Sequence, residues 1–425
     1  LAASGGFVAV SVPVSLVRAQ GAVRSGISGA GSVTSAGTVS VTTDILFKNL
    51  SAAAAFGGGA VSVNAALPLS ISRVTGDTFI GQGVSVVAGN VEVAANAVTS
   101  TRAALLGVNG GAVAVGAGVA IAIDQANLST YIGADPQGAS ASSGIGTVRA
   151  TGDVRVRNTI ASLSEPVIFA ATAGAVAASV NVLLAFNRSN AVASISGSHI
   201  NADGDIVVEG LLSEATARAD LYRAGAGAIA AGVNVAYAQM RADNAARLDA
   251  AGASIRAGGD VKIYAGTQAA PSKALAEAST MSGDVGAIAG AVNVAIADND
   301  ARNEASLLGT VTADGSIFVE AWLRSGAPAN LHGLNIGGIA VGMGTLVSVD
   351  RTRNLAIIEN GDIHAASLQV VAQADPIEGQ NVASVELVQG AGSLIGAGVN
   401  VAVAYSRVEN IASANIKNIE LAGAL

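Results

Sequence analysis

The sequence predicts an all-β fold, an elongated parallel β-solenoid (β-helix) built from about eight copies of a roughly 53-residue repeat. Two observations lead to this fold class. A short apolar-x-apolar motif recurs along the whole chain at a nearly constant spacing, and the segments between its copies are rich in Gly, Ala and Val. A fixed period indicates stacked copies of one structural unit, in which each copy covers the open face of its neighbour.

The recurring motif follows a turn, and a second apolar residue closes the segment before that turn. The motif stands at Val39-Ser-Val41, Val91-Glu-Val93, Val154-Arg-Val156, Ile206-Val-Val208, Val261-Lys-Ile263, Ile317-Phe-Val319, Leu368-Gln-Val370 and Ile419-Glu-Leu421. The closing residues are Ile27, Ile80, Ile132, Ile195, Leu248, Leu307, Ile358 and Ala414. From each motif to the next closing residue the step is 41 to 46 residues, which is too regular for unrelated segments.

The segment before each closing residue has the pattern of a long strand of small apolar residues, as in 111–123 and 227–237. A helix is disfavoured here, because each interior Gly costs a helix roughly 1 kcal/mol. Ala and Gly separate the Val and Ile positions, so we expect both faces of the strand to be buried. Val235 is expected to point inward. The long strand and the motif strand are each long enough for one turn, so we favour two or more coils per repeat over one broad coil.

The chain is expected to form a single continuous repeat array over 1–425 and to be a fragment of a longer chain, because no polar capping segment is visible at either end. The approximate units are 1–50, 51–103, 104–166, 167–218, 219–272, 273–328, 329–380 and 381–425. One insertion, at 135–144, has loop composition and should leave the register of the core unchanged.

The composition argues against several classes of protein. Apolar residues make up 51% of the chain and charged residues 12%, with a net charge of −8 and no Cys. An acidic chain with few basic clusters lacks the positive footprint of a nucleic-acid-binding protein. No stretch of 18 or more apolar residues without Gly predicts a membrane helix.

Two rows of polar residues recur at fixed positions of the repeat. One is the Asn of a Val-Asn-Val motif, at Asn181, Asn234, Asn293 and Asn400, with Gly118 and Ala66 at this position in other copies. The other is an Arg six residues after that motif, at Arg73, Arg188, Arg241, Arg351 and Arg407, followed by Asn190, Asn244, Asn354 and Asn410. For the Asn row we favour a ladder of stacked amides over a ligand-binding row. For the Arg row we favour a solvated corner over a binding row for anionic polysaccharide or phosphate.

A third row precedes the apolar-x-apolar motif. It consists of Asp153, Asp205 and Asp260, with Thr38, Asn90, Ser316 and Ser367 in other copies. Turn chemistry accounts for Asp, Asn, Ser and Thr together, whereas calcium-binding loops require spacings that this sequence lacks. His199, His332 and His364 fall at different phases of the repeat, and no catalytic motif is visible. The sequence therefore predicts no catalytic residues, no cofactor-binding residues, no cofactor and no metal ligands.

Three segments carry a resemblance to a known family: Gly-Gly-Ala-Val-Ala-Val-Gly-Ala-Gly-Val-Ala-Ile-Ala-Ile at 110–123, Ser-Thr-Tyr-Ile-Gly at 129–133 and Gly-Asp-Val-Arg-Val at 152–156. With them the chain resembles the repetitive regions of giant filamentous adhesins of Gram-negative bacteria. These are β-strand-repeat proteins grouped with filamentous haemagglutinins and leukotoxin-type adhesins. The resemblance covers essentially the whole chain. It implies an exported cell-surface β-solenoid whose shaft presents or links adhesive parts, and it implies no catalytic residues.

We therefore expect the non-catalytic structural shaft of an extracellular bacterial adhesin or surface filament, attached to the outer membrane, that mediates surface attachment or matrix and filament formation. The expected partners are other segments of the same longer chain, further shafts through lateral self-association, and a host surface or polysaccharide, but no nucleic acid. One alternative is a polysaccharide-binding or polysaccharide-cleaving β-helix, which a groove with converging carboxylates and aromatic residues would favour. Another is a self-assembling sheath protein, which large exposed Ala/Val surfaces would favour.

Overall fold

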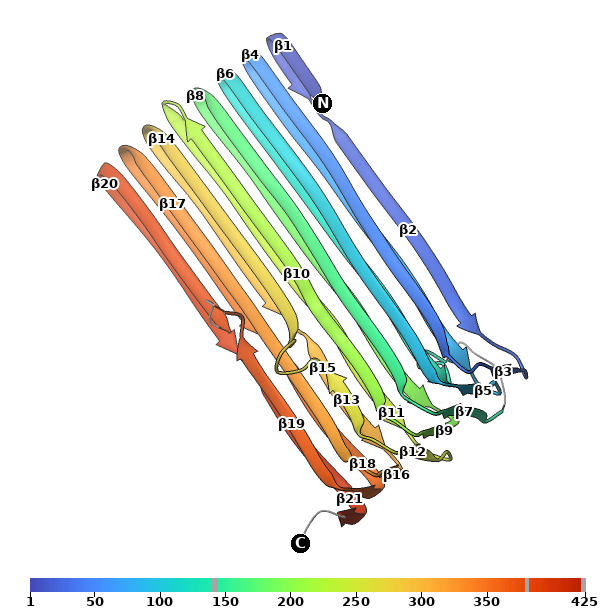
Figure 1. Cartoon of the computed structure of the whole chain (residues 1–425). Helices are drawn as coiled ribbons and strands as arrows, with labels where there is room; N and C mark the ends of the chain where they lie inside the picture. The colour runs from blue at the N-terminus through green and yellow to red at the C-terminus, as the bar shows by residue number, and fades with distance from the viewer. Residues whose placement is uncertain (139–143, 379–381, 422–425) are drawn as a thin grey trace.

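The computed structural model describes residues 1–138, 144–378 and 382–421, and in these ranges it contains strands and no helix (Figure 1). The strands are β1 (Ala2–Ser11), β2 (Val14–Ile27), β3 (Ser32–Thr34), β4 (Thr38–Gly81), β5 (Ser85–Ala88), β6 (Asn90–Gly133), β7 (Gly146–Ala150), β8 (Val154–Ser196), β9 (Ser198–Ala202), β10 (Ile206–Ala226), β11 (Ile229–Asp249), β12 (Ile255–Ala257), β13 (Val261–Ala265), β14 (Ser272–Asn299), β15 (Arg302–Leu308), β16 (Val311–Ala313), β17 (Ser316–Asp350), β18 (Arg353–Ala365), β19 (Ser367–Pro376), β20 (Ala383–Ser406) and β21 (Glu409–Leu421). Neighbouring strands pair in parallel, which confirms the all-β, parallel solenoid fold class.

The register of these pairs shows how the chain is stacked. The closing residues form one unbroken column in which Ile27 pairs with Ile80, Ile80 with Ile132, Ile132 with Ile195, Ile195 with Leu248, Leu248 with Leu307, Leu307 with Ile358, and Ile358 with Ala414. Each strand therefore pairs with the segment one repeat further along the chain. One repeat makes one broad coil, so the expectation of two or more coils per repeat is wrong.

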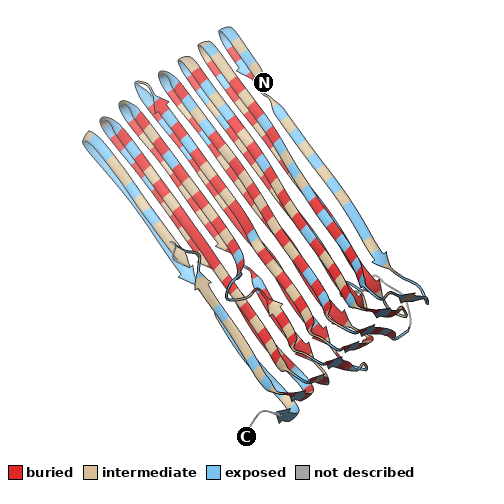
Figure 2. Cartoon of the chain, in the orientation of Figure 1, coloured by how far each residue is buried: buried red, intermediate tan, exposed pale blue. Residues whose placement is uncertain are grey.

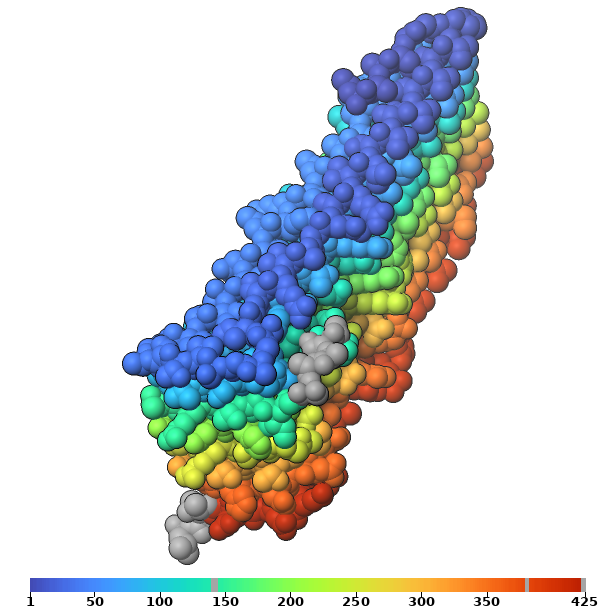
Figure 3. Space-filling model, turned by 90° about the vertical axis from the view of Figure 1, so that its right-hand side faces the viewer, coloured from blue at the N-terminus to red at the C-terminus, as the bar shows by residue number. Residues whose placement is uncertain are grey.

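Each coil consists of two long arms and a short third side. In β6 the outgoing arm covers 91–110, the chain then reverses, and the return arm covers 112–133. A short strand such as β5, β7, β9, β12 or β16 closes the coil before the next outgoing arm. We call the reversal the tip and the end with the short strands the base; Figure 1 shows the tips along its upper left side and the bases along its lower right side. Figure 3 shows the successive coils as stacked layers of colour.

The interior of the coil is wide at the base and narrow towards the tip. At the base a third side separates the two arms, and the core there is built mostly from Val and Ile together with Ala, including Val91, Ile132 and Val148. Between the two arms the core is mostly Ala, with Leu at some positions, as at Ala120 and Leu183. Because two sheets that meet at a tight reversal lie close together, small side chains predominate between them.

The return arms place their large apolar residues on the outside. In β11 the buried residues are Asn234 and Ala236, whereas Val233 and Val235 face outward. The prediction that Val235 points inward is therefore wrong, and so is the expectation that the chain buries both faces of this strand. The alternation was recognised, but its phase is opposite, since the narrow interior accepts the small residue of each pair. Figure 2 shows the resulting alternation of buried and less buried residues along the arms.

Two details of the register complete the account of the repeat. The first seven apolar-x-apolar motifs form one column, from Val39 to Leu368, as predicted. Ile419-Glu-Leu421 is not part of it, because Ile419 pairs with Ile363 in the column of the short strands. The insertion at 135–144, of which 139–143 lie outside the described residues, leaves the register of the pairs on either side intact.

A column of glycines forms the tips. It comprises Gly6, Gly59, Gly111, Gly174, Gly227, Gly286 and Gly337. A Cβ on any of the last six would collide with the carbonyl oxygen of the glycine in the preceding coil. The backbones of successive tips therefore approach closely from Gly6 to Gly337, and Ser393 follows Gly337 in the last coil.

Candidate functional site

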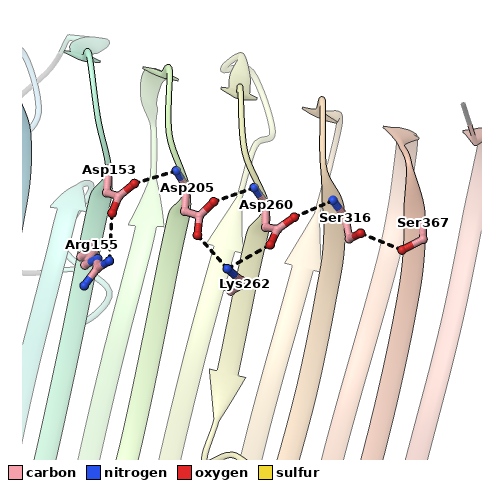
Figure 4. A network of polar contacts seen from close by, with 7 residues as sticks. All are labelled: Asp153, Arg155, Asp205, Asp260, Lys262, Ser316 and Ser367. Atoms are coloured by element: carbon pink, nitrogen blue, oxygen red, sulfur yellow. Dashed lines mark hydrogen bonds and ion pairs between the residues drawn. The ribbon is translucent and has the colours of Figure 1, made fainter. Parts of the chain in front are cut away.

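The Asp row before the apolar-x-apolar motif forms a continuous ladder along the base of the stack (Figure 4). Each side chain accepts a hydrogen bond from the backbone N–H of the equivalent residue in the next coil. The four bonds run from Asp153 N to Asn90 Oδ1 (2.8 Å), from Asp205 N to Asp153 Oδ1 (2.9 Å), from Asp260 N to Asp205 Oδ1 (2.8 Å) and from Ser316 N to Asp260 Oδ1 (2.8 Å). A side-chain oxygen of each coil is therefore bonded to the turn backbone of the next coil.

The remaining carboxylate oxygens of this ladder are bound by cationic side chains. Lys262 Nζ lies 2.7 Å from Asp205 Oδ2 and 3.0 Å from Asp260 Oδ2, and Arg155 lies 2.8 Å from Asp153 Oδ2 (Figure 4). Burial opposes ionisation of Asp205, but the hydrogen bond and the charge of Lys262 outweigh it and lower the pKa of that carboxyl. These contacts use the oxygens that a calcium ion would need, which supports the turn interpretation of the row.

The Val-Asn-Val row lies inside the return arms and forms a second ladder. Asn181 Nδ2 donates to Asn234 Oδ1 at 3.0 Å, and Asn234 Nδ2 donates to Asn293 Oδ1 at 2.8 Å. All three side chains are buried, so no ligand in solution reaches them. Ala66 and Gly118 precede Asn181 in the register, as the sequence indicates, and Gly344 forms a further gap between Asn293 and Asn400 that was not predicted.

A third ladder lies where the return arm nears the base. Asn244 Nδ2 donates to Asn303 Oδ1 (2.7 Å), Asn303 Nδ2 to Asn354 Oδ1 (2.8 Å), and Asn354 Nδ2 to Asn410 Oδ1 (3.4 Å). Asn244, Asn354 and Asn410 were predicted from the sequence, but Asn303 was not. The prediction that Asn190 belongs to this row is wrong, since Asn190 pairs with Asp243, one position before Asn244. An alignment by register rather than by distance from the Arg would have found the row.

The Arg row lies on the outer side of the return arms, where Arg73, Arg188 and Arg241 are within strands and Arg351 and Arg407 lie in the breaks between β17 and β18 and between β20 and β21. Arg73, Arg188, Arg241, Arg351 and Arg407 are all exposed. Gln125 stands between Arg73 and Arg188 in the register, and Arg351 forms an ion pair with Asp298 at 2.7 Å. Solvent exposure is the placement that the solvated interpretation predicts.

A buried ion pair near the tip is the main feature that the sequence analysis missed. Arg223 Nη1 lies 2.6 Å from Asp284 Oδ2, and both side chains are completely buried. The guanidinium also donates to Ser179 Oγ and to the carbonyl of Ala231, the latter at 2.8 Å. Burial raises the pKa of Asp284, and the bond from Arg223 opposes that rise. Gly232 provides the space, because a Cβ there would overlap the guanidinium. The sequence signal for this pair is that Arg223 and Asp284, of opposite charge, stand in tip segments that otherwise carry no charge.

Two further carboxyls, those of Asp124 and Asp350, are buried in the return arms and accept hydrogen bonds from uncharged donors. Burial raises the pKa of Asp124 to about 6, although Thr99 donates a 2.6 Å hydrogen bond to it. Burial likewise raises the pKa of Asp350 to about 6, against hydrogen bonds that include one from Thr352. Both belong to one inward column with Asn187 and Asn299, so their place is structural.

The histidines lie apart, as predicted. His199 binds Ser254, His364 binds Glu420 at 2.9 Å, and His332 is in the outgoing arm of β17. Within the described ranges, no three His, Cys, Asp or Glu side chains gather as metal ligands would. The same part of the chain has no helix that could cross a membrane.

The outer face of the outgoing arms carries the carboxylates and aromatic rings that bear on a polysaccharide site. Arg102–Glu165 and Arg218–Glu277 form ion pairs of 2.8 Å each, in one row across successive coils. Nearer the tip, Phe169 and Tyr222 stack with ring centroids 4.9 Å apart and planes 8° apart. Each ring thus covers one face of the other, Leu106 and Met281 flank the pair in the register on the faces where a sugar would stack, and Arg218 neutralises Glu277.

A comparison with protein-family models, curated proteins and solved structures finds no match for this chain.

Proposed function

We propose that the chain is a non-catalytic structural shaft of an extracellular bacterial adhesin or surface filament. The observation that carries the proposal is the use of polar side chains. Asp and Asn rows bond from one coil to the next at the base and in the interior of the return arms, and Arg223 bonds to Asp284 of the next coil near the tip. Residues placed in this way join coils and are not available to a substrate. A stack in which each coil contacts its neighbours suits a spacer that extends by adding copies.

The polysaccharide-cleaving alternative requires two carboxyl groups that face one substrate. The pair nearest to that description is Asp220 and Glu277, beside the aromatic stack. Burial raises the pKa of Asp220 to about 6, and Arg218 lies 3.6 Å from it. We treat cleavage as the outcome that would refute the shaft. Release of reducing ends from acidic or neutral polysaccharides, lost in Asp220→Asn, would show that the chain is an enzyme.

The location is tested on the cells that produce the protein. Antibodies against the purified chain are applied to intact and to permeabilised cells and detected by immunogold microscopy. A surface shaft predicts labelling of intact cells, on extended material outside the outer membrane. Labelling that requires permeabilisation would contradict the proposal.

A further inference from the structure

The outer side of the return arms is a broad apolar surface, which we call the return face. In β6 it consists of the alternating residues 113 to 123, and the register extends it over the return arms of β4, β8, β11, β14, β17 and β20. In these seven arms it contains mostly Val, Ile, Leu and Ala, with single aromatic residues, Gly290, Met343 and the uncharged polar residues Thr345 and Gln239, and no charged residue between the tip and Asp298 or the Arg row. Large apolar patches on a soluble protein indicate an interaction site.

We propose that the return face is the interface between two copies of this shaft, packed face to face. This pairing does not depend on where the shaft is located or on what it attaches to. Its first support is the pattern of the strands. Val and Ile outside with Ala inside is the pattern of a sheet covered on both sides, and within one chain only the inner side is covered.

The size of the return face fits a stable pairing. Twelve residues of strand at about 3.3 Å each span about 40 Å, and seven arms about 4.8 Å apart span about 34 Å. The product is about 1,300 Å² per copy, or about 2,600 Å² in a pair. This exceeds the roughly 1,600 Å² of a standard stable interface.

The shape of the return face is also complementary to the same face of a second copy. A shallow groove runs along the stack, with Ala178, Ala231 and Gly290 as its floor and the column of Val180, Val233 and Val292 as a ridge beside it. Flat sheets pack about 10 Å apart with interdigitated side chains. In a two-fold pair the ridge of each copy lies in or beside the groove of the other, and the contact closes after two copies.

A lipid surface fits the molecule less well, because the two outer faces differ. On the outgoing face the charged row of Arg102 and Glu165 lies only eight or nine residues from the tip, about 26–30 Å at strand spacing. If the tips entered a lipid layer deeply enough to cover the return face, this charged row would also be buried. A second shaft packed on the return face leaves the charged row in water.

The test measures the mass of the chain in solution by sedimentation. Wild type is expected at twice the 41.2 kDa of one chain. Val180→Glu with Met343→Glu, on the return face, is expected to sediment as a monomer with an unchanged circular dichroism spectrum, because both side chains are about half exposed (49% and 46%). The matched control is Leu106→Glu with Leu334→Glu on the outgoing face, 43% and 51% exposed, which should stay dimeric.

A cross-link gives a second readout that does not need a disruptive variant. The chain has no Cys, and Val233 lies in a middle coil of the return face, near the expected two-fold axis. Val233→Cys should form a disulfide-linked dimer on oxidation, and Leu106→Cys should not. The proposal is overturned if wild type is monomeric at tens of micromolar, if the return-face glutamates leave the dimer intact, or if the wild-type chain floats with phosphatidylcholine vesicles as a monomer.

Discussion

The side-chain amide of Asn234 donates to Asn293 Oδ1 at 2.8 Å, although 59 residues separate the two in sequence. Both amides are buried between the arms of the stack. The bond is possible because one repeat makes one coil, which brings equivalent residues of successive repeats to the spacing of neighbouring strands. Polar side chains in the interior can thus be satisfied along the stacking axis instead of by water.

Breaking this ladder should destabilise the stack. Asn234→Ala leaves the amide of Asn181 and the side-chain oxygen of Asn293 without this partner, at about 1–3 kcal/mol for each buried group. We expect the free energy of unfolding, measured by denaturant titration, to fall by about 2–6 kcal/mol. Asn400→Ala, in the exposed end coil, is the control and should change it by less than about 0.5 kcal/mol. Equal effects of the two substitutions would contradict the role of the ladder.

The tip offers a comparison between adjacent glycines. A Cβ on Gly111 would collide with the carbonyl oxygen of Gly59, whereas a Cβ on Gly110 meets nothing within 4 Å. Gly111→Ala should cost about 1–3 kcal/mol or more, as forced overpacking does, and Gly110→Ala should be nearly neutral. Thermal unfolding of the two variants checks this. If both variants have the melting temperature of wild type, successive tips do not approach as closely as described.

Asp124 should make stability depend on pH. Burial raises its pKa from 3.8 to about 6, so the folded state holds the proton more tightly than the unfolded chain. The stability present below pH 3.8 is therefore lost as pH rises towards about 6 and stays lost at pH 7. Asp124→Asn removes the charge, and a shift of about two pKa units corresponds to a gain of up to about 3 kcal/mol at pH 7.

The measurement is the free energy of unfolding of wild type and Asp124→Asn at pH 4 to 7. The difference should be small at pH 4 and grow up to about pH 6. Asp314→Asn, at an exposed pair with Arg256, is the control for a loss of surface charge. A variant that is less stable than wild type at pH 7 would show that the ionised carboxylate is accommodated.

The buried pair of Arg223 and Asp284 should be strongly coupled. Removing one partner leaves an uncompensated charge, at a cost of about 3–5 kcal/mol. Arg223→Met and Asp284→Asn should therefore each destabilise the protein, and the double variant should be more stable than the sum of the single losses predicts. Additive losses in a double-mutant cycle would mean that the two groups do not interact across the coils.

The sequence was most informative where the interior of the coil is wide. The column from Ile27 to Ala414 and the motif column from Val39 to Leu368 were predicted residue by residue, because large apolar side chains face the roomy base. The Asn234 ladder was also predicted, since a repeated Asn between apolar neighbours has few other partners.

The errors arise where the interior is narrow. Val235 was assigned inward because the larger apolar residue of an alternating pair is usually the buried one, but in this arm the narrow interior holds Asn234 and Ala236. The number of coils per repeat was misjudged because strand length alone does not show where the chain turns, and the tip turns lack the polar residues that usually mark a turn. The Arg223–Asp284 pair depends on space left by glycines, which a single sequence does not reveal.

The most direct test of the account is the distance between equivalent residues of the Arg row. The chain lacks Cys, so Arg73→Cys can be combined with Arg351→Cys or with Arg407→Cys, and spin labels at these exposed positions can be measured by double electron–electron resonance. One coil per repeat puts Arg351 five steps and Arg407 six steps from Arg73 along the stack. At about 4.8 Å per step these separations are about 24 and 29 Å. Distances near twice these values, or a shorter distance for Arg407 than for Arg351, would contradict a stack of single broad coils.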